Sequence, residues 1–352
     1  MSYTNGLDKP DLYFNTVLYT GDNTSNRSIT GVGFQPDLTW HKTRNQAYSH
    51  SLFDAVRGAG KRLVSNQTSA EGTTSDFVSF DSDGVTISQG GDQFNASGDT
   101  EVLWNWLGAN GTASNTDGSI TSTVSANTTS GFSIVSYTGT GANATVGHGL
   151  GVVPACIILK NRDDGTSYWR VGHQSLTWNN EIFLNDSAGT NASSGAWNNT
   201  APTSTVFSLG TGGYGNASGQ KIIAYCFAEK KGFSKFGKYT GNGSSDGTFV
   251  YTGFKPSFVI TKCSSTSSSY THWGMWDNKR SPFNVADKQL ASNLSDEENS
   301  ANIGGQYIDM LSNGFKCRTS ESAHNQSGVN YIYMAFAENP LVGTNNIPAT
   351  AR

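Results

Sequence analysis

Two motifs with fixed spacing occur three times in this chain. Each copy begins with Tyr-Thr-Gly. A proline lies seventeen residues after the tyrosine, and a lysine lies six residues after the proline. Asn-x-Ser-Gly comes later in each copy, with an aromatic residue eight positions after its glycine. The recurring positions are Tyr19, Pro36, Lys42, Gly98 and Trp106; Tyr137, Pro154, Lys160, Gly219 and Phe227; and Tyr239, Pro256, Lys262, Gly328 and Phe336. Repetition at this period indicates one folding unit of roughly 100 residues used three times.

The repeats divide the 352-residue chain into three units with an arm at each end. Three units of this size fit the length that single domains commonly have. We expect an N-terminal arm (1–13), unit one (14–107), a linker with a possible strand (108–131), unit two (132–229), unit three (233–338) and a C-terminal arm (339–352). The link at 230–232 is short, which predicts that units two and three pack in a fixed relation.

Composition and local pattern predict an all-β protein with many turns. Charged residues make up 14% of the chain, Gly occupies 41 positions, and short apolar runs are separated by clusters of Gly, Asn, Ser and Asp. Apolar side chains lie two and four residues after each recurrent proline, as at Leu38 and Trp40. This period of two is typical of a strand with one inward face.

The recurring residues are best explained as structural. Asn-x-Ser-Gly is turn chemistry, because Asn and Gly tolerate positive φ and Ser can bond the local backbone. The recurrent lysine lies an even number of residues after the inward-facing positions, so its side chain points to the same face of the strand. Burying an ammonium there is costly unless it emerges at the strand end or meets a carboxylate. The distance between proline and second glycine differs among the copies, so the variable loops lie mid-unit. Binding specificity is expected in those loops.

Several classes of function are disfavoured. The net charge is −4 and no basic cluster is longer than a few residues, so we expect no nucleic-acid partner. No apolar run is long enough for a transmembrane helix, so we expect no membrane insertion. The polar N-terminus predicts a protein assembled in a cytoplasm, with its four cysteines reduced. The six histidines fall at unrelated positions of the repeat and no catalytic motif is present, so we expect no enzyme.

Candidate contact residues lie off the repeated frame. Trp178, Trp197 and Tyr214 belong to the variable part of unit two and are flanked by small polar residues, which is how a surface stacks a sugar. The alternative is that these rings cap the core. Two basic turns that follow an aromatic-Asp pair are candidates for gripping an acidic glycan or a partner subunit, or are solvated loops: Arg57, Lys61 and Arg62, and Lys279 and Arg280.

No cofactor is expected. Two turns, 81–84 and 163–165, offer carboxylates to Ca²⁺, but neither has the later Glu of a complete calcium loop. Both are also ordinary β-turn sequences, so calcium stays a weak alternative.

The frame resembles a repeat domain of structural proteins of tailed phages that infect aquatic bacteria, of the tail-fibre or adhesin kind. The resemblance rests on Tyr-Thr-Gly, on Gly-Phe-x-Pro at 33–36 and 253–256, on Trp276-Asp277 with Arg280, and on the endings at 339–342 and 347–352. Unit two departs from it with Val171-Gly172-His173. The resemblance implies a virion component built of β-sandwich domains of the lectin or jelly-roll kind, without catalytic residues. The expected fold is therefore three tandem β-sandwich repeats.

The expected function is that of a non-enzymatic virion surface protein, an adhesin-type tail protein that contacts host surface glycans. The alternatives are a capsid decoration or tail-assembly subunit, and a glycan-binding or glycan-cleaving module. Expected partners are other virion proteins and a host surface polysaccharide, with the chain forming a homo-oligomer, a trimer by preference. The expected location is the virion surface, after assembly in the host cytoplasm.

Overall fold

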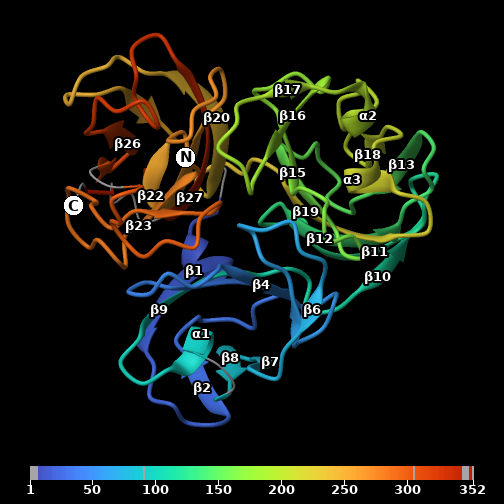
Figure 1. Ribbon diagram of the computed structural model, residues 1–352, viewed down its shortest axis with the longest axis horizontal. Helices are drawn as coiled ribbons and strands as arrows, with labels where there is room; N and C mark the ends of the chain where they lie inside the picture. The colour runs from blue at the N-terminus through green and yellow to red at the C-terminus, as the bar shows by residue number, and fades with distance from the viewer. Residues whose placement is uncertain (1–6, 90–91, 304–305, 343–348, 351–352) are drawn as a thin grey trace.

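The computed structural model describes residues 7–89, 92–303, 306–342 and 349–350 (Figure 1). The protein is mostly β, with several antiparallel sheets, as the composition predicts. Its described helices are single turns, none of them long and apolar enough to cross a membrane. The elements of unit one and its arm are η1 (Pro10–Leu12), β1 (Phe14–Thr20), β2 (Arg27–Thr30), β3 (Leu38–Thr43), β4 (Ser51–Asp54), β5 (Lys61–Arg62), β6 (Gly72–Thr73), β7 (Phe77–Asp81), β8 (Gly84–Ile87), α1 (Asp92–Asn95) and β9 (Thr100–Trp106).

Units two and three repeat this order with local changes. The elements of unit two are β10 (Ala113–Asn115), β11 (Ser122–Asn127), β12 (Phe132–Thr138), β13 (Ala144–Gly147), β14 (Cys156–Asn161), β15 (Arg170–His173), β16 (Asn180–Phe183), β17 (Asn191–Ala192), α2 (Ser194–Trp197), β18 (Val206–Leu209), α3 (Gly213–Asn216) and β19 (Lys221–Phe227). Those of unit three are β20 (Ser234–Thr240), β21 (Phe249–Tyr251), β22 (Phe254–Cys263), β23 (Gly274–Asp277), β24 (Leu290–Ala291), β25 (Ile308–Leu311), β26 (Gly314–Cys317) and β27 (Asn330–Pro340).

Each unit contains the same four-stranded antiparallel arrangement. The strand orders are β1-β9-β3-β4, β12-β19-β14-β15 and β20-β27-β22-β23, so the closing strand always lies between the opening strand and the proline-led strand. Pro36 and Pro154 precede their strands, whereas Pro256 lies inside β22 at a register irregularity. Proline has no N–H to give to a ladder, which is why it occurs at a strand start or a bulge.

A smaller sheet lies across from one face of each large sheet. These sheets are β2-β8-β7, β13-β18 and β21-β26-β25. In unit one, Ile29, Val85 and Phe77 of the small sheet pack with Phe53 and Leu103 of the large sheet in a core of their own. Units two and three have corresponding cores.

The opposite faces of the three large sheets share one further core. The three lobes surround this centre in Figure 1, with unit one at the bottom, unit two at the right and unit three at the upper left. The closing aromatics Trp106, Phe227 and Phe336 form a triangle there, with ring centroids 5.6–6.2 Å apart. The units are therefore arranged around a pseudo-threefold axis. The expected tandem row of jelly-roll domains is not shown.

The segments outside the units join the same body. Residues 108–131, expected to be a linker, supply β10 and β11, which extend the large sheet of unit two. In the N-terminal arm, the Leu7 N–H donates to Lys231 O (3.2 Å) and Tyr13 packs edge-on against Phe233. Strand β27 continues to Pro340, beyond the predicted boundary at 338. Most of the predicted C-terminal arm (343–348 and 351–352) and residues 1–6 of the N-terminal arm lie outside the described residues.

In each unit, hydrogen bonds join the Tyr-Thr-Gly motif to the Asn-x-Ser-Gly motif. The hydroxyls of Tyr19, Tyr137 and Tyr239 donate to the carbonyl that precedes the asparagine of Asn-x-Ser-Gly, at 2.6–2.7 Å. That asparagine is buried, and its amide bonds the backbone of the loop after Tyr-Thr-Gly: Asn95 to Asp22 and Thr24, Asn216 to Thr140 and Ala142, and Asn325 to Asn242 and Ser244. The motif recurs because each hydrogen bond is needed in each unit.

Glycine is required in both of the motifs that these hydrogen bonds join. A Cβ at Gly21, the third residue of the first Tyr-Thr-Gly, would lie 2.0 Å from the carbonyl oxygen of Ala96. Gly98, Gly219 and Gly328 have φ of +86°, +75° and +77°, a region that other residues rarely adopt. Their N–H groups donate to the carbonyls of the Tyr-Thr-Gly glycines.

Candidate functional site

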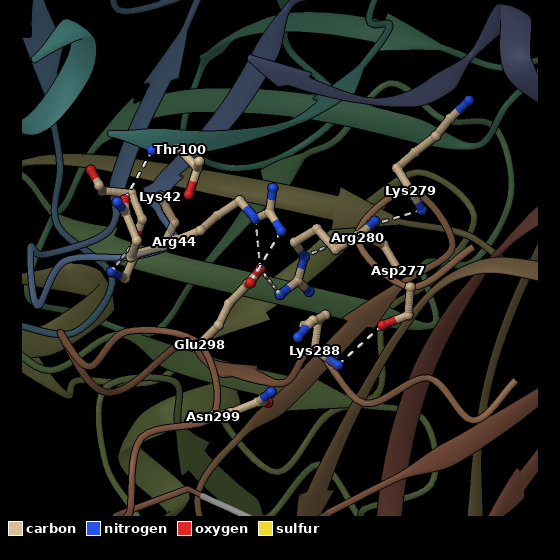
Figure 2. A network of polar contacts seen from close by, with 12 residues as sticks. Lys42, Arg44, Thr100, Asp277, Lys279, Arg280, Lys288, Glu298 and Asn299 are labelled. Atoms are coloured by element: carbon tan, nitrogen blue, oxygen red, sulfur yellow. Dashed lines mark hydrogen bonds and ion pairs between the residues drawn. The ribbon is translucent and has the colours of Figure 1, made fainter. Parts of the chain in front are cut away.

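Arg280, predicted on a basic surface turn, is instead buried in an ion network between units three and one (Figure 2). Its Nε donates to Asp277 Oδ2, and its Nη1 lies 3.2 Å from Glu298 Oε1. Arg44 of unit one binds the same carboxylate with two hydrogen bonds, of 2.7 and 3.1 Å. Trp104 of unit one donates its indole N–H to Asp277 Oδ2 at 3.0 Å. This network is a structural contact between units.

Arg57 occupies the equivalent place between units one and two. Its Nε donates to Asp54 Oδ2, and its Nη1 lies 3.2 Å from Glu71 Oε2. Arg162 of unit two closes the network on Glu71 at 2.8 and 2.9 Å. The hydroxyl of Tyr225 in unit two donates to Asp54 at 2.7 Å, as the indole of Trp104 does to Asp277. Neither buried arginine is available to a ligand. The expectation of an exposed basic turn that binds an acidic glycan or a partner subunit is therefore wrong for Arg57 and Arg280.

Burial by itself would lower the pKa of the Arg57 guanidinium, but Asp54, Tyr225 and Glu71 together outweigh burial and the pKa is raised. The same balance, with Asp277, raises the pKa of Arg280. Burial raises the pKa of Glu71, whereas hydrogen bonds from Arg162 and the charge of Arg57 lower it, with a net lowering.

Over the described ranges, the contact between units two and three has no matching network of two arginines and two carboxylates. His173 and Leu176 stand where the other units have Asp and Arg, and Thr190 and Ser264 stand where they have Glu and Arg. The Thr190 N–H donates to Ser264 O at 3.1 Å, matching the backbone bond from Glu298 to Arg44. His173 Nε2 lies 3.2 Å from Tyr333 O, so the neutral ring donates there.

The other three basic candidates are separate from one another. The Arg62 Nε donates to Ser51 Oγ at 2.8 Å, and its guanidinium lies over the ring of Phe94. Lys61 is half-buried, and its carbonyl accepts a hydrogen bond from Arg57. Lys279 is exposed on the turn drawn in Figure 2. The structure does not bring these side chains together into one basic surface.

The recurrent lysines are fully buried and bind backbone carbonyls rather than carboxylates. Lys160 Nζ donates to Ser167 O in its own unit and to Thr68 O of unit one, at 2.9 and 2.8 Å. Lys262 Nζ likewise donates to Ser187 O of unit two at 2.8 Å. Burial lowers the pKa of Lys42, Lys160 and Lys262 to about 8. These lysines hold the loops at the contacts between units.

The aromatic candidates of unit two have different environments. Trp197 is fully buried in the core of unit two, so the expectation that its ring stacks a ligand is corrected. Trp178 is half-buried and packs edge-on against Trp197, with centroids 5.3 Å apart. Tyr214 is half-buried and joins a cluster with Tyr168 and Phe183, at centroid distances of 5.9 and 5.8 Å. This cluster adjoins a groove through Tyr168.

The groove lies between units one and two and has a volume of about 550 Å³, within the range of small-ligand sites. Unit one contributes the loop 66–69, and unit two contributes Gly165, Tyr168, Asn185 and Asp186. Asn185 Oδ1 is held by the Trp169 N–H at 2.8 Å, and Asp186 Oδ1 by the Ala188 N–H at 3.0 Å. We call this set of residues the seam groove.

The seam groove presents an aromatic ring beside unused polar atoms. Within the described part of the chain, the Tyr168 hydroxyl, Asn185 Nδ2 and Asp186 Oδ2 have no hydrogen-bond partner. The Tyr168 ring is fixed against Phe183 at a centroid distance of 4.9 Å. A pre-oriented ring with a neighbouring amide and carboxylate can stack one face of a sugar and bond its hydroxyls. The lining contains one carboxylate and no cation.

The sequence argument missed Tyr168, Asn185 and Asp186. The signal that could have found them is an Asn-Asp pair in the variable part of unit two, close to aromatic residues. Their proximity to the loop 66–69 of unit one is set by the contact between units, which no local pattern reveals.

The proposed calcium turns use their carboxylates internally. Asp83 accepts the N–H groups of Gly31 and Gly33, and Asp164 accepts hydrogen bonds from Thr166 and Ser167. Among the described ranges, no group of three or more His, Cys, Asp or Glu side chains is placed to hold a metal ion. The four cysteines are buried and free.

The fold and the seam groove define a mostly β protein of three units closed around a common core, with a polar and aromatic groove at one contact between units. The chain belongs to the family described as Domain of unknown function (DUF7483), which it matches over residues 9–340. The match spans all three units as one domain. No curated protein and no solved structure matches the chain.

Proposed function

We propose that the protein is a non-enzymatic surface protein of a tailed-phage virion, and that its seam groove binds a glycan of the host surface. The observation that carries the glycan part is the half-exposed Tyr168 ring beside the unpartnered atoms of Asn185 and Asp186. The virion location rests on the sequence resemblance. We further propose that each unit is a β-sandwich of the lectin-like kind.

The scaffold supports recognition by a pre-formed site. The groove lies at a contact that the Arg57 network and Lys160 hold from both sides, so binding requires little reordering. Glycoside hydrolysis usually needs two carboxylates flanking the bond, and the lining contributes Asp186 alone. This favours binding over cleavage. Release of reducing ends from a host polysaccharide, lost in Asp186→Asn, would establish the glycan-cleaving alternative instead.

The test is a glycan array probed with the purified protein, followed by binding to polysaccharide from susceptible hosts. We expect wild-type binding, and its loss in Tyr168→Ala and in Asp186→Asn. Tyr307→Ala is the matched control, because Tyr307 is an exposed tyrosine on unit three that does not line the groove. Absence of binding by the wild type, or equal binding by all variants, would contradict the proposal. Immunogold labelling of virions tests the location.

A second candidate is a capsid decoration or tail-assembly subunit. It is favoured by the exposed large apolar side chains on unit three, among them Phe283 at 77% exposure. Such side chains on one lobe are typical of a protein–protein contact. Saturable binding to purified capsids without any glycan binding would favour this candidate.

A further inference from the structure

Exposed apolar residues are concentrated on unit three. Six of the ten large apolar side chains that are exposed in the described part of the chain belong to it: Phe249, Tyr251, Tyr270, Phe283, Val285 and Tyr307. Two of them, Phe249 and Tyr251, lie on the three-residue strand β21, and their side chains are 45% and 58% exposed. Between them Val250 is buried in the core of unit three. The strand therefore has an inner side chain and two outer aromatic ones.

Strand β21 also presents an open backbone edge. It is the outermost strand of the sheet β21-β26-β25. The Cys317 N–H donates to Thr248 O and the Thr252 N–H to Asn313 O, so the hydrogen-bonded pairs with β26 fall at 248, 250 and 252. By the alternation of an antiparallel ladder, the N–H and C=O groups of Phe249 and Tyr251 point away from β26. An edge of this kind is a template for another strand.

The equivalent edges of the other two units are protected. In unit two, the segment 119–120 lies against β13: the Ile120 N–H donates to Thr145 O at 3.0 Å, and Ile120 bridges to Val146. In unit one, the edge strand β2 carries Arg27 and hydroxyl side chains. Charges and polar residues discourage strand addition. Among the residues that the structure describes, nothing covers strand β21 in either way, and aromatic residues favour strand pairing.

We propose that β21 pairs antiparallel with β21 of a second copy of this chain, about a twofold axis at Val250. In this register Phe249 of each copy lies directly opposite Tyr251 of the other, in a hydrogen-bonded pair. Two aromatic cross-strand pairs then form on the outer face. The three-stranded sheets join into one continuous six-stranded sheet. A contact in which the same surface meets itself closes as a dimer.

The charges near β21 are compatible with this twofold contact. Lys316, the partner of Phe249 on β26, is 2.6 Å from Asp246, and Arg318 lies 3.3 Å from the same carboxylate. Arg318 also lies 3.4 Å from Asp309, so two carboxylates balance the two cations within one copy. Tyr251 lies beside Gly314, which has no side chain, and the ring of Phe249 of the same copy lies over that glycine.

The test begins with the mass of the full chain in solution by sedimentation velocity over a concentration series. We expect a species of twice the 37.5 kDa chain mass, and its loss in Phe249→Lys/Tyr251→Lys. Ser28→Lys, on the outer face of the edge strand of unit one, is the matched control and leaves the dimer intact. A monomer at all concentrations, a trimer, or a dimer unaffected by the two lysines would overturn the proposal.

A second measurement tests the register. Phe249→Cys and Tyr251→Cys are prepared separately, mixed and oxidised, with the four native cysteines buried and unreactive. Because position 249 lies opposite position 251 of the partner, we expect disulfide-linked dimers mainly in the mixture. Equal linkage in each variant alone, or none in the mixture, would refute the proposed pairing even if a dimer exists.

Discussion

Replacing Asp277 by Asn tests the ion network that joins units three and one. The Asp277 carboxylate accepts hydrogen bonds from the Arg280 side chain, from the Trp104 indole, and from the backbone N–H groups of Lys279 and Arg280. The side chains of Asp277 and Arg280 are both fully buried. Asp277→Asn keeps the shape but removes the charge that compensates the guanidinium. Glu298, 3.2 Å from Nη1, is then its remaining carboxylate.

The expected cost is about 3–5 kcal/mol in the free energy of unfolding, as for other buried pairs broken by removing one partner. Unit two shows that the position does not need a charge, because His173 and Leu176 stand at the equivalent places. Arg280→Leu combined with Asp277→Asn should therefore cost less than the sum of the two single changes. We expect a coupling of about 2 kcal/mol or more in this cycle.

The assay is equilibrium unfolding in urea, followed by both tryptophan fluorescence and far-UV circular dichroism. Coincident transitions are required before the free energies are compared. Asp54→Asn, in the matching network between units one and two, provides an internal replicate. Additive single changes, or an Asp277→Asn variant within about 1 kcal/mol of wild type, would refute the reasoning.

Three other outcomes are expected. Burial lowers the pKa of His173 to about 4 and of His324 to about 3, against 6.5 in the unfolded chain. The unfolded state thus binds more protons below pH 6.5. Burial also lowers the pKa of His50, His148 and His272, so stability measured by urea unfolding should fall by at least about 4 kcal/mol between pH 7 and pH 5; His173→Gln should remove about 2 kcal/mol of that fall, and a flat profile would contradict it. Trp106→Ala, at the centre of the shared core, should cost about 3–5 kcal/mol in the same assay, whereas a loss below about 1 kcal/mol would mean that the core is not shared. Gly241→Ala places a Cβ 2.3 Å from a backbone carbonyl oxygen and should lower the melting temperature clearly more than Gly213→Ala, which meets nothing within 4 Å.

The repeated frame was visible in the sequence because its hydrogen bonds depend on fixed local spacing. The hydroxyl of Tyr137, for example, binds the carbonyl of Gly215, next to the asparagine of Asn-x-Ser-Gly, and the Gly219 N–H binds back to Gly139. Any unit that keeps these hydrogen bonds must keep those residue types. The strand content could be predicted for a similar reason, since a period of two marks a strand whatever covers it.

The shared core could not be predicted in the same way. A period of two identifies an inward face at Trp104 and Trp106, but it does not say whether a small sheet or two other units cover that face. Arg57 shows the same limit: its spacing from Asp54 is local, whereas Glu71 bridges it to Arg162, which is 91 residues from Glu71. The seam groove depends on that contact, so the Asn185-Asp186 pair could be noticed in the sequence but its place beside the loop 66–69 could not be predicted.

The three contacts between units differ in a way that chain connectivity explains. The charged network of Arg44 and Glu298 joins residues 254 positions apart, at the contact where the first unit meets the last. Units two and three, whose contact lacks a matching ion network among the described residues, are joined by the short link 230–232, which already limits their relative orientation. Closing a long loop costs more entropy than closing a short one. Buried ion networks specify geometry more than they add net stability, so we infer that they are placed where the chain itself does least to fix the arrangement.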